Sequence, residues 1–177
     1  KTLVDTGFNV NIIHLVGSGG DNPETLHILS SFHLRDLSIY SVCADLKSLS
    51  FCKDLRILFL QGCERVSDVN PLSSLSSLEH LALLGLALLS DISPLRVLRL
   101  KTLQLIGGSC LRDLRPLSGL AKDLWRLVIS CWGEGQLTDL TPLATLSNLT
   151  SLTKLDLSNC TSLNNVKPLS SLTSLKV

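Results

Sequence analysis

The stretch LRILFLQGCERVSDVNPL, residues 55–72, is the unit that the rest of the chain repeats with variations. Its first half has the spacing L-x-x-L-x-L, in which Leu58 and Leu60 alternate as they do on one face of a short strand. Cys63, a small and largely apolar side chain, then occupies a bend that we expect to be buried. Pro71 restricts its own φ and has no N–H to donate, so the second half suits a turn or the first turn of a short 3₁₀ or α segment.

The unit recurs along the chain at intervals of 21 to 28 residues, counted from the second leucine of the strand. The marker residues are Ile13, Leu37, Leu58, Leu81, Leu103, Leu127 and Leu155. The second half recurs in register as Asp or Asn, an apolar residue, any residue, Pro and Leu, starting at Asp68, Asp91, Asp113, Asp139 and Asn165. Each of these side chains stands where it can accept backbone N–H groups of the following turn.

A period of about 20 to 29 residues with this internal pattern is the signature of leucine-rich repeats. The sequence therefore predicts an α/β solenoid, a leucine-rich-repeat horseshoe with a parallel concave sheet and short 3₁₀, helical or irregular convex segments. Each repeat buries its leucines against its neighbours, and each buried leucine contributes roughly 1.5–3 kcal/mol. Residues 34–54 lack the Asp-x-x-Pro half, and Leu46 and Leu49 favour a short helix there.

The composition restricts the class of protein and of partner. Hydrophobic residues make up 45% of the chain and aromatic residues 4%, which fits a leucine ladder better than a mixed globular core. The 16 basic and 15 acidic residues are scattered and give a formal net charge of +1. No charged field favours nucleic acid or an anionic membrane, so we expect neither as the partner. No apolar run approaches the roughly 20 residues that span a bilayer.

The two ends of the chain read as parts of further repeats. The chain begins KTLVD, with neither an initiator Met nor the apolar stretch of a signal peptide. Residues 1–8 look like the tail of a preceding repeat, and residues 170–177 lead toward another strand. Because solenoids have polar caps at their ends, we expect residues 1–177 to be a single array of about seven repeats, a fragment lacking both caps.

The six cysteines are Cys43, Cys52, Cys63, Cys110, Cys131 and Cys160. Cys63 and Cys160 occupy equivalent turn positions in different repeats, which favours buried packing over a disulfide. The chain has no C-x-x-C pair and no Cys/His cluster at metal-ligand spacing. We expect no metal, no cofactor, and a reducing intracellular compartment, cytoplasmic or organellar.

Groups that often act in catalysis are present, but none is arranged as a catalytic site. His14 and His80 fall on outward-facing strand positions and read as solvated side chains. The turn aspartates would form a column on stacking, yet each has its own local turn to cap. Residues 17–20, GSGG, lack the spacing of phosphate-binding and dinucleotide loops, so a flexible turn is preferred. We therefore predict no enzyme and no small-molecule substrate.

The concave strand face is the best candidate for a functional surface. Residues between and beside the strand leucines point away from the core, because side chains alternate along a strand. Contiguous exposed apolar groups rimmed by polar ones mark interaction surfaces, and Trp, Tyr and Arg are frequent hot spots. We predict a partner-binding surface made of Tyr40, Ile57, Phe59, Leu84, Ile106, Trp125, Arg126 and Val128. The alternative is that β-strands simply prefer such residues.

Residues 62–78, GCERVSDVNPLSSLSSL, resemble the repeat of kinetoplastid leucine-rich-repeat proteins, and residues 158–175 resemble it again. In those proteins a Gly-Cys turn precedes an Asp-Val-x-Pro-Leu segment and a Ser-rich link. The Asp-x-x-Pro-Leu half is also similar to bacterial internalins, which usually have Asn where this chain has Cys63, Leu86, Gly108 and Cys160. The resemblance covers roughly residues 34–177. It implies a curved solenoid for protein–protein contact, with no cofactor or catalytic residue to carry over.

The leading hypothesis is a non-enzymatic scaffold that binds a protein, of unknown identity, through the concave sheet. A second hypothesis is an architectural segment of a larger complex, contacting its neighbours through the convex side, the open ends or inserted loops such as the one around Trp132. A third is an accessory domain of a larger enzyme or RNA-associated protein. Repeats of this kind serve unrelated functions, so the pattern predicts the architecture much more strongly than the role.

Overall fold

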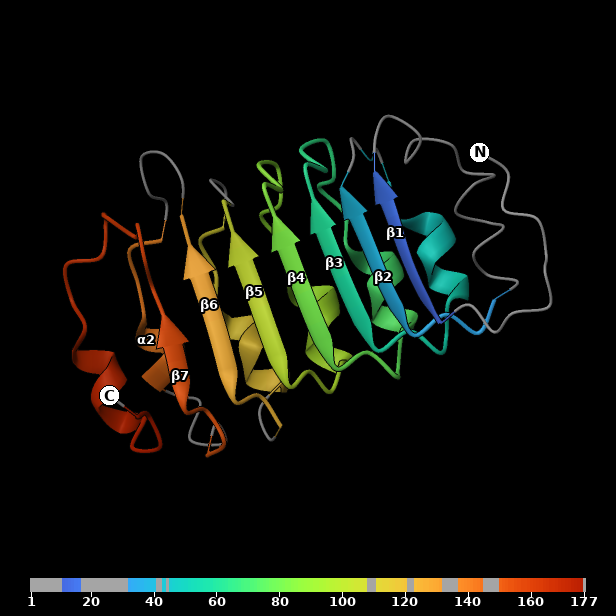
Figure 1. Ribbon diagram of the computed structural model, residues 1–177. Helices are drawn as coiled ribbons and strands as arrows, with labels where there is room; N and C mark the ends of the chain where they lie inside the picture. Colours follow the sequence, from blue (N-terminus) through green and yellow to red (C-terminus); the bar gives the residue numbers. More distant parts are fainter. Residues whose placement is uncertain are drawn as a thin grey trace.

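Seven parallel strands lie side by side in chain order and form one open sheet (Figure 1). The computed structural model describes residues 11–16, 32–40, 43, 45–107, 111–120, 123–131, 137–144 and 150–176. Strands that follow one another in the sequence are neighbours in the sheet, because each repeat returns the chain to the same edge one strand further on. The strands are β1 Ile12–Val16, β2 Asp36–Tyr40, β3 Ile57–Gln61, β4 His80–Leu84, β5 Thr102–Ile106, β6 Arg126–Ser130 and β7 Lys154–Asp156.

The strands pair in the register that the repeat alignment predicts. Between β3 and β4, Leu58 pairs with Leu81 and Leu60 pairs with Leu83. The other neighbouring strands align their marker residues in the same way. In β2 to β6 the marker leucines are at most 1% exposed. The predicted leucine ladder, in which alternate strand residues form one continuous core, is confirmed.

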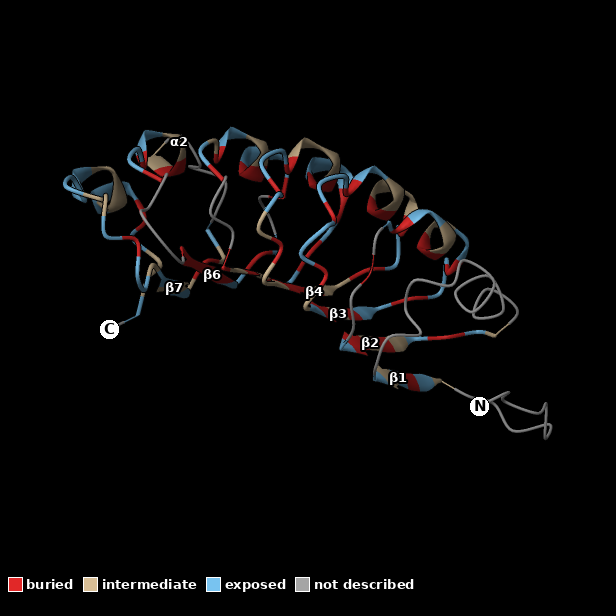
Figure 2. Cartoon of the chain, turned by 90° about the horizontal axis from the view of Figure 1, so that it is seen from above, coloured by how far each residue is buried: buried red, intermediate tan, exposed pale blue. Residues whose placement is uncertain are grey.

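From the second repeat onward, the return half of each repeat forms about one turn of helix, and these turns line one side of the sheet. Figure 2 shows the two layers, with the buried residues between them. The third residue of each turn, such as Leu72 or Leu95, is buried against the core, except in the last turn, where Leu169 is partly buried. This confirms the predicted solenoid of parallel strands and short 3₁₀ segments. The segments are η2 Lys47–Phe51, η3 Asn70–Ser74, η4 Ser93–Val97, η5 Arg115–Leu120, α2 Thr141–Ala144 and η6 Lys167–Ser171.

The bend after the strand is buried, as the sequence predicts, and Cys63 is 0% exposed. Immediately before this bend the backbone enters the left-handed region, with φ of 81° at Gly62 and 74° at Gly85. Glycine adopts this conformation without the steric penalty of a Cβ atom. Asn159 occupies the equivalent position after β7 with φ of 60°. Asparagine is one of the few other residues that tolerate this region.

One glycine is required by the close stacking of the return segments. A Cβ atom on Gly119, in η5, would lie 2.4 Å from the carbonyl oxygen of Arg96 in η4. That distance is well inside van der Waals contact with a backbone atom, which cannot rotate away. The absence of a side chain at Gly119 therefore lets two neighbouring repeats approach each other.

The second repeat and the last one both follow the pattern more closely than their sequences suggest. In the second repeat the predicted short helix is the 3₁₀ segment η2, and Ser48 stands where other repeats have Pro. The Asp45 carboxylate accepts the N–H of Lys47 at 3.0 Å, as the turn aspartates do elsewhere. At the other end, the N–H of Lys176 donates to the carbonyl of Thr153 at 3.0 Å. The same contact precedes the strands β3 to β7.

Several sequence predictions lie outside the described residues. They concern residues 1–8, the glycine loop at residues 17–20, Cys110, and the insertion around Trp132. In the part of the chain that the structure describes, no helix combines the length and the apolar character needed to cross a bilayer.

Candidate functional site

The face of the sheet that is turned away from the 3₁₀ layer, called the sheet face below, is the open surface of the molecule. It carries the first, third and fifth residues of each five-residue strand, because the second and fourth residues enter the leucine core. No described element covers it, and Figure 2 shows all the helical turns on the opposite side. Side chains on this face are therefore available to another molecule wherever their neighbours leave them exposed.

An apolar patch occupies the sheet face between β2 and β5. The side chains of Tyr40 and Ile57 are 41% and 39% exposed, and those of Phe59, Leu84 and Ile106 are partly exposed. The rings of Tyr40 and Phe59 lie with their centroids 5.1 Å apart and their planes tilted by 36°. This is a diagonal contact between neighbouring strands, within the favourable range for aromatic pairs. The five residues predicted from the sequence for this region share one face of the sheet.

Val128 is less exposed than the sequence predicts. It lies on the sheet face at the third position of β6, but it is only 5% exposed. Its register partners are Gln104 and Asp156, whose longer side chains flank the short valine. The expectation that Val128 contributes exposed apolar surface is therefore wrong.

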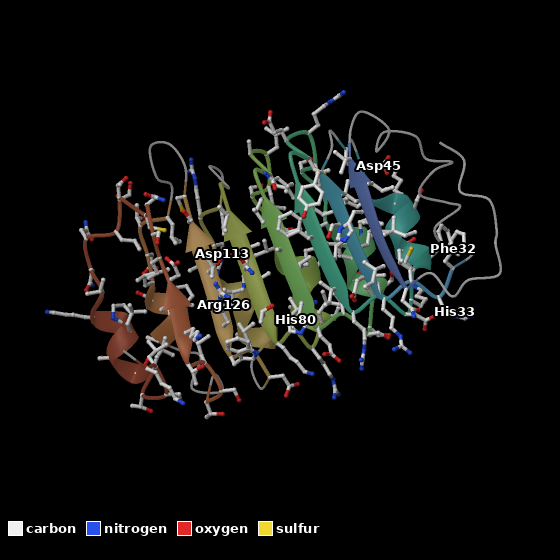
Figure 3. The ribbon with its side chains drawn as sticks, in the orientation of Figure 1. Phe32, His33, Asp45, His80, Asp113 and Arg126 are labelled. Carbon is white, nitrogen blue, oxygen red and sulfur yellow. The ribbon has the colours of Figure 1, made fainter. Side chains whose placement is uncertain are left out.

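A cationic site, called the basic corner below, consists of Trp125, Arg126 and Lys154 at the starts of β6 and β7. Arg126 and Lys154 are exposed register partners, and Figure 3 shows Arg126 over the sheet. The Lys154 Nζ atom lies 5.7 Å from the centroid of the Trp125 ring, a cation–π distance. Trp125 is 36% exposed. Trp125 and Arg126, both predicted for the partner-binding surface, lie at the start of β6, the strand next to β5.

The strand starts between the basic corner and the apolar patch carry their own charge pairs. Glu79 precedes β4, and its carboxylate contacts Arg56 Nη2 at 3.2 Å and Lys101 Nζ at 2.8 Å. The hydrogen bond from Lys101, with the charge of Arg56, lowers the pKa of Glu79. His80 Nδ1 lies 2.9 Å from the Thr102 hydroxyl. These contacts are structural bridges between neighbouring repeats, and none resembles a nucleophile and base aimed at an open pocket.

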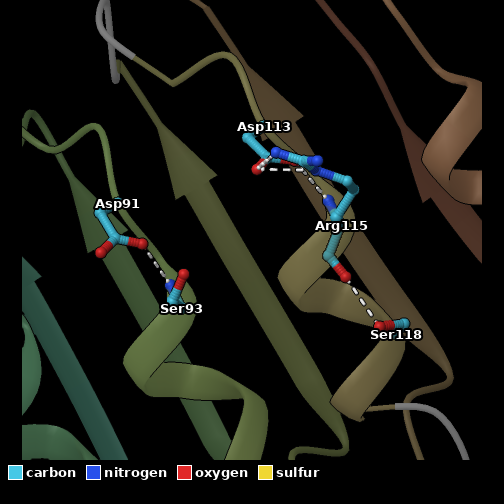
Figure 4. Close-up of polar contacts among 5 residues, drawn as sticks. All are labelled: Asp91, Ser93, Asp113, Arg115 and Ser118. Atoms are coloured by element: carbon cyan, nitrogen blue, oxygen red, sulfur yellow. Dashed lines mark hydrogen bonds and ion pairs between the residues drawn. The ribbon is translucent and has the colours of Figure 1, made fainter.

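The column of turn aspartates is a set of local caps, as the sequence predicts. The carboxylate of Asp91 accepts the N–H of Ser93 at 2.7 Å (Figure 4). Asp139 accepts the N–H of Thr141 at the same distance. Asp68 and Asp113 make the same bond two residues ahead. Side-chain and backbone hydrogen bonds lower the pKa of Asp91, Asp113 and Asp139. Among the described residues, no group of three or more His, Cys, Asp or Glu side chains is placed to hold a metal ion.

Two bacterial solved structures are similar to this chain. An internalin (inlF) from Listeria monocytogenes is 28% identical and has a TM-score of 0.75; the match covers 94% of this chain and 46% of the internalin. Internalin C2 from the same organism is 25% identical with a TM-score of 0.63, over 95% of this chain and 76% of its own length. The fold is that of leucine-rich-repeat proteins. This chain spans about half the length of the first internalin. No protein-family model matches the sequence, and no curated protein is significantly similar to it.

The likeness to internalins supports the predicted leucine-rich-repeat type, whereas the kinetoplastid resemblance stays a prediction. This leucine-rich-repeat chain has apolar or thiol side chains at the turn position where the internalin pattern has Asn. Cys63, Leu86 and Cys160 are all buried there. The Cys160 thiol lies 3.4 Å from the Ile129 carbonyl and 3.5 Å from the Cys131 sulfur. Burial raises the pKa of Cys160 to about 12, so this thiol remains protonated at neutral pH.

Proposed function

We propose that this chain is a non-enzymatic module that binds a protein partner through its sheet face, with the apolar patch at the centre of the contact. The observation that carries the proposal is the exposed Tyr40–Phe59 ring pair beside the exposed Ile57 on an open face. Exposed apolar groups bordered by charged ones are typical of interaction surfaces, and aromatic side chains supply much of the binding energy there.

Strand propensity alone does not account for the patch. At the same sheet-face positions other strands carry Ser38, Gln104 or Asp156, so the fold accepts polar residues there. Withdrawing a fully exposed large apolar side chain from water is worth roughly 1.5–3 kcal/mol. Five apolar residues that are at least partly exposed together on the open face, where other strands carry polar residues, favour a role in binding.

The proposal is tested by identifying the partner and then comparing two matched substitutions. A photo-cross-linking amino acid at position 59 captures the partner, which mass spectrometry identifies and which is then purified. We expect Phe59→Asp to leave the circular-dichroism spectrum unchanged and to weaken binding by about 2 kcal/mol or more, the size of a hot-spot loss. Val97→Asp is the control, because Val97 is 61% exposed on the opposite layer, in η4. Equal affinity of Phe59→Asp and the unchanged chain contradicts the proposal.

A second candidate is an architectural role in which the 3₁₀ layer contacts a neighbouring subunit. It is favoured by Phe51 and Val97, which are 59% and 61% exposed at the ends of η2 and η4. The same pair of variants separates the two roles. If Val97→Asp weakens the complex and Phe59→Asp does not, the contact lies on the 3₁₀ layer.

A further inference from the structure

We propose that the sheet face selects a partner that presents an extended segment with acidic side chains at one end and apolar side chains at the other. The acidic end would lie on the basic corner, and the apolar end on the apolar patch. This inference rests on the proposed function and adds the chemistry of the partner.

Positive charge predominates where the strands begin. Around the sheet face, the last residue before each strand and the first residue of each strand include five basic side chains: Arg35, Arg56, Lys101, Arg126 and Lys154. The acidic side chains at the same places are Asp36 and Glu79. Glu79 already bridges Arg56 and Lys101, at 3.2 Å and 2.8 Å. Of these five cations, those without an ion pair among the described residues are therefore Arg35, at the start of β2, and the adjacent Arg126 and Lys154, which form the one side-by-side pair, at the basic corner.

Arg126 and Lys154 are like charges placed side by side. They are register partners on neighbouring parallel strands, whose backbones are about 4.8 Å apart, and like charges in this position repel. Within the described part of the chain, no carboxylate forms an ion pair with either of them. The nearby Asp156 carboxylate attracts Arg126 from beyond ion-pair distance and is itself hydrogen-bonded by the Ser158 N–H, at 2.9 Å, and by the Ser158 hydroxyl, so it compensates the two cations only in part. An anion from a partner would relieve this repulsion.

Trp125 makes the basic corner a binding surface and not merely a pair of charges. Its ring is 36% exposed and lies under the Lys154 ammonium group, 5.7 Å from the ring centroid. This contact holds the lysine stem in place, which reduces the entropy lost when a carboxylate binds. Trp and Arg together are the residue types most enriched at interface hot spots.

The distance between the two surfaces matches a short extended segment. From Ile57 on β3 to Lys154 on β7 there are four strand spacings, or about 19 Å at about 4.8 Å each. An extended chain advances about 3.3 Å per residue, so about six residues reach from one surface to the other. A segment of six to eight residues that crosses the strands can therefore contact both.

A protein segment fits these surfaces better than a nucleic acid does. Nucleic-acid affinity depends on many phosphate contacts, whereas only two unpaired cations meet at the basic corner and the chain has a formal net charge of +1. The apolar patch would leave a phosphate backbone without partners. Carboxylates beside aromatic or aliphatic side chains complement both parts of the sheet face.

The test is selection of random octapeptides displayed on phage against the whole chain. Enriched peptides are synthesised with fluorescein, and their dissociation constants are measured by anisotropy at low and high salt. We expect Asp or Glu toward one end and aromatic or aliphatic residues toward the other. The double variant Arg126→Glu, Lys154→Glu should raise Kd about tenfold or more at low salt and less at high salt. Arg126→Gln with Lys154→Gln should give a smaller loss.

The matched control is Arg65→Glu with Arg112→Glu, which makes the same charge change on exposed residues of the turns outside the sheet face. It should leave Kd unchanged. The inference is overturned if no peptide is enriched, if the enriched peptides lack acidic residues, or if charge reversal at the basic corner leaves Kd unchanged. In the last case, loss of binding in Phe59→Asp would still support the proposed function. A labelled RNA decamer that binds through Arg126 and Lys154 but not through Phe59 would also overturn it.

Discussion

Single residues in this chain have opposite environments one position apart. Leu58 is 1% exposed in the core, while the next residue, Phe59, is partly exposed on the sheet face. The two differ only in which side of the strand they occupy, since successive side chains point to opposite faces. Hydrophobicity alone therefore does not separate structural residues from candidate binding residues here.

The first prediction at this scale compares a buried leucine of β4 with an exposed leucine in the turn that follows. Leu81 is 1% exposed in β4, and Leu88 is 54% exposed in the turn that follows. We expect Leu81→Ala to lower the free energy of unfolding by about 2–5 kcal/mol, because the variant buries fewer apolar groups and leaves a cavity in the core. Leu88→Ala should change it by less than about 0.5 kcal/mol. Urea unfolding of both variants measures this, and equal losses would show that the leucine register is wrong.

The second prediction concerns the Cys160 thiol. Burial raises its pKa from 9.0 to about 12, so the folded chain retains this proton at pH values where the unfolded chain releases it. The stability that this group contributes is therefore complete below pH 9 and is lost as the pH rises toward 12. Between pH 8 and 10.5 the free energy of unfolding should fall less in Cys160→Ala than in the unchanged chain. If the free energy of unfolding depends on pH identically in the two proteins, the pKa of Cys160 is not raised.

At the scale of the element, the turn between strand and 3₁₀ segment accepts either Asp or Asn. Its hydrogen bond joins residues only two positions apart. The carboxylate of Asp91 caps η4 through the Ser93 N–H, and Asn165 makes the same bond to Lys167 at 3.0 Å. An amide oxygen and a carboxylate oxygen are thus equivalent acceptors in this turn. Proline stands at the second position of η3, η4 and η6. It has no backbone N–H, and an N–H at the start of a helix would have no acceptor within the helix.

The equivalence of amide and carboxylate oxygens in this turn can be tested at Asp91, with the Asn variant as the control. Asp91→Ala should lower the free energy of unfolding by about 0.5–2 kcal/mol, the usual effect of losing a cap. Asp91→Asn should retain most of the stability near neutral pH. The pKa of Asp91 is lowered from 3.8, so its contribution is present above that pH and is lost as the pH falls through the lowered pKa. The Asn variant should lose less stability on acidification, and thermal unfolding between pH 6 and 2.5 measures the difference.

At the scale of the whole molecule, the burial of core residues within residues 1–177 is lower in the β7 repeat than in β3 to β5. The core residues of β3 to β5 are buried, whereas Leu155, Leu163 and Leu169 in the β7 repeat are only partly buried. Each repeat is stabilised by the neighbours on both sides, so a repeat with less contact on one side opens at lower free energy.

The corresponding prediction is a gradient of amide hydrogen exchange. In this 177-residue chain, amides of β3 to β5 should exchange at least about tenfold more slowly than those of β7, because local opening costs less where less apolar surface is buried. Mass spectrometry of exchanged peptides measures the rates strand by strand. Uniform protection from β3 to β7 would show that the chain unfolds as one cooperative unit, against a stack of repeats.

The sequence by itself determined the repeat boundaries, the strand register and the burial of residues such as Leu58 and Cys63. These follow from spacing along the chain, because side chains alternate on a strand and turns require particular residues. The Asp-x-x-Pro-Leu segments determined the 3₁₀ layer for the same reason. The local role of Asp91 was therefore predictable from its own neighbours in the sequence.

Only the tertiary structure decided which outward residues another molecule can reach. Val128 and Ile57 occupy outward positions of their strands, yet Val128 is 5% exposed and Ile57 is 39% exposed. The register partners that flank each of them lie on the two neighbouring strands, more than 20 residues away in the sequence. The stacking of Lys154 on Trp125 and the neutralisation of Glu79 by Arg56 also depend on adjacent repeats. Packing between side chains of neighbouring strands determines which outward residues are exposed and which charges are paired. The pattern within one repeat does not encode this packing.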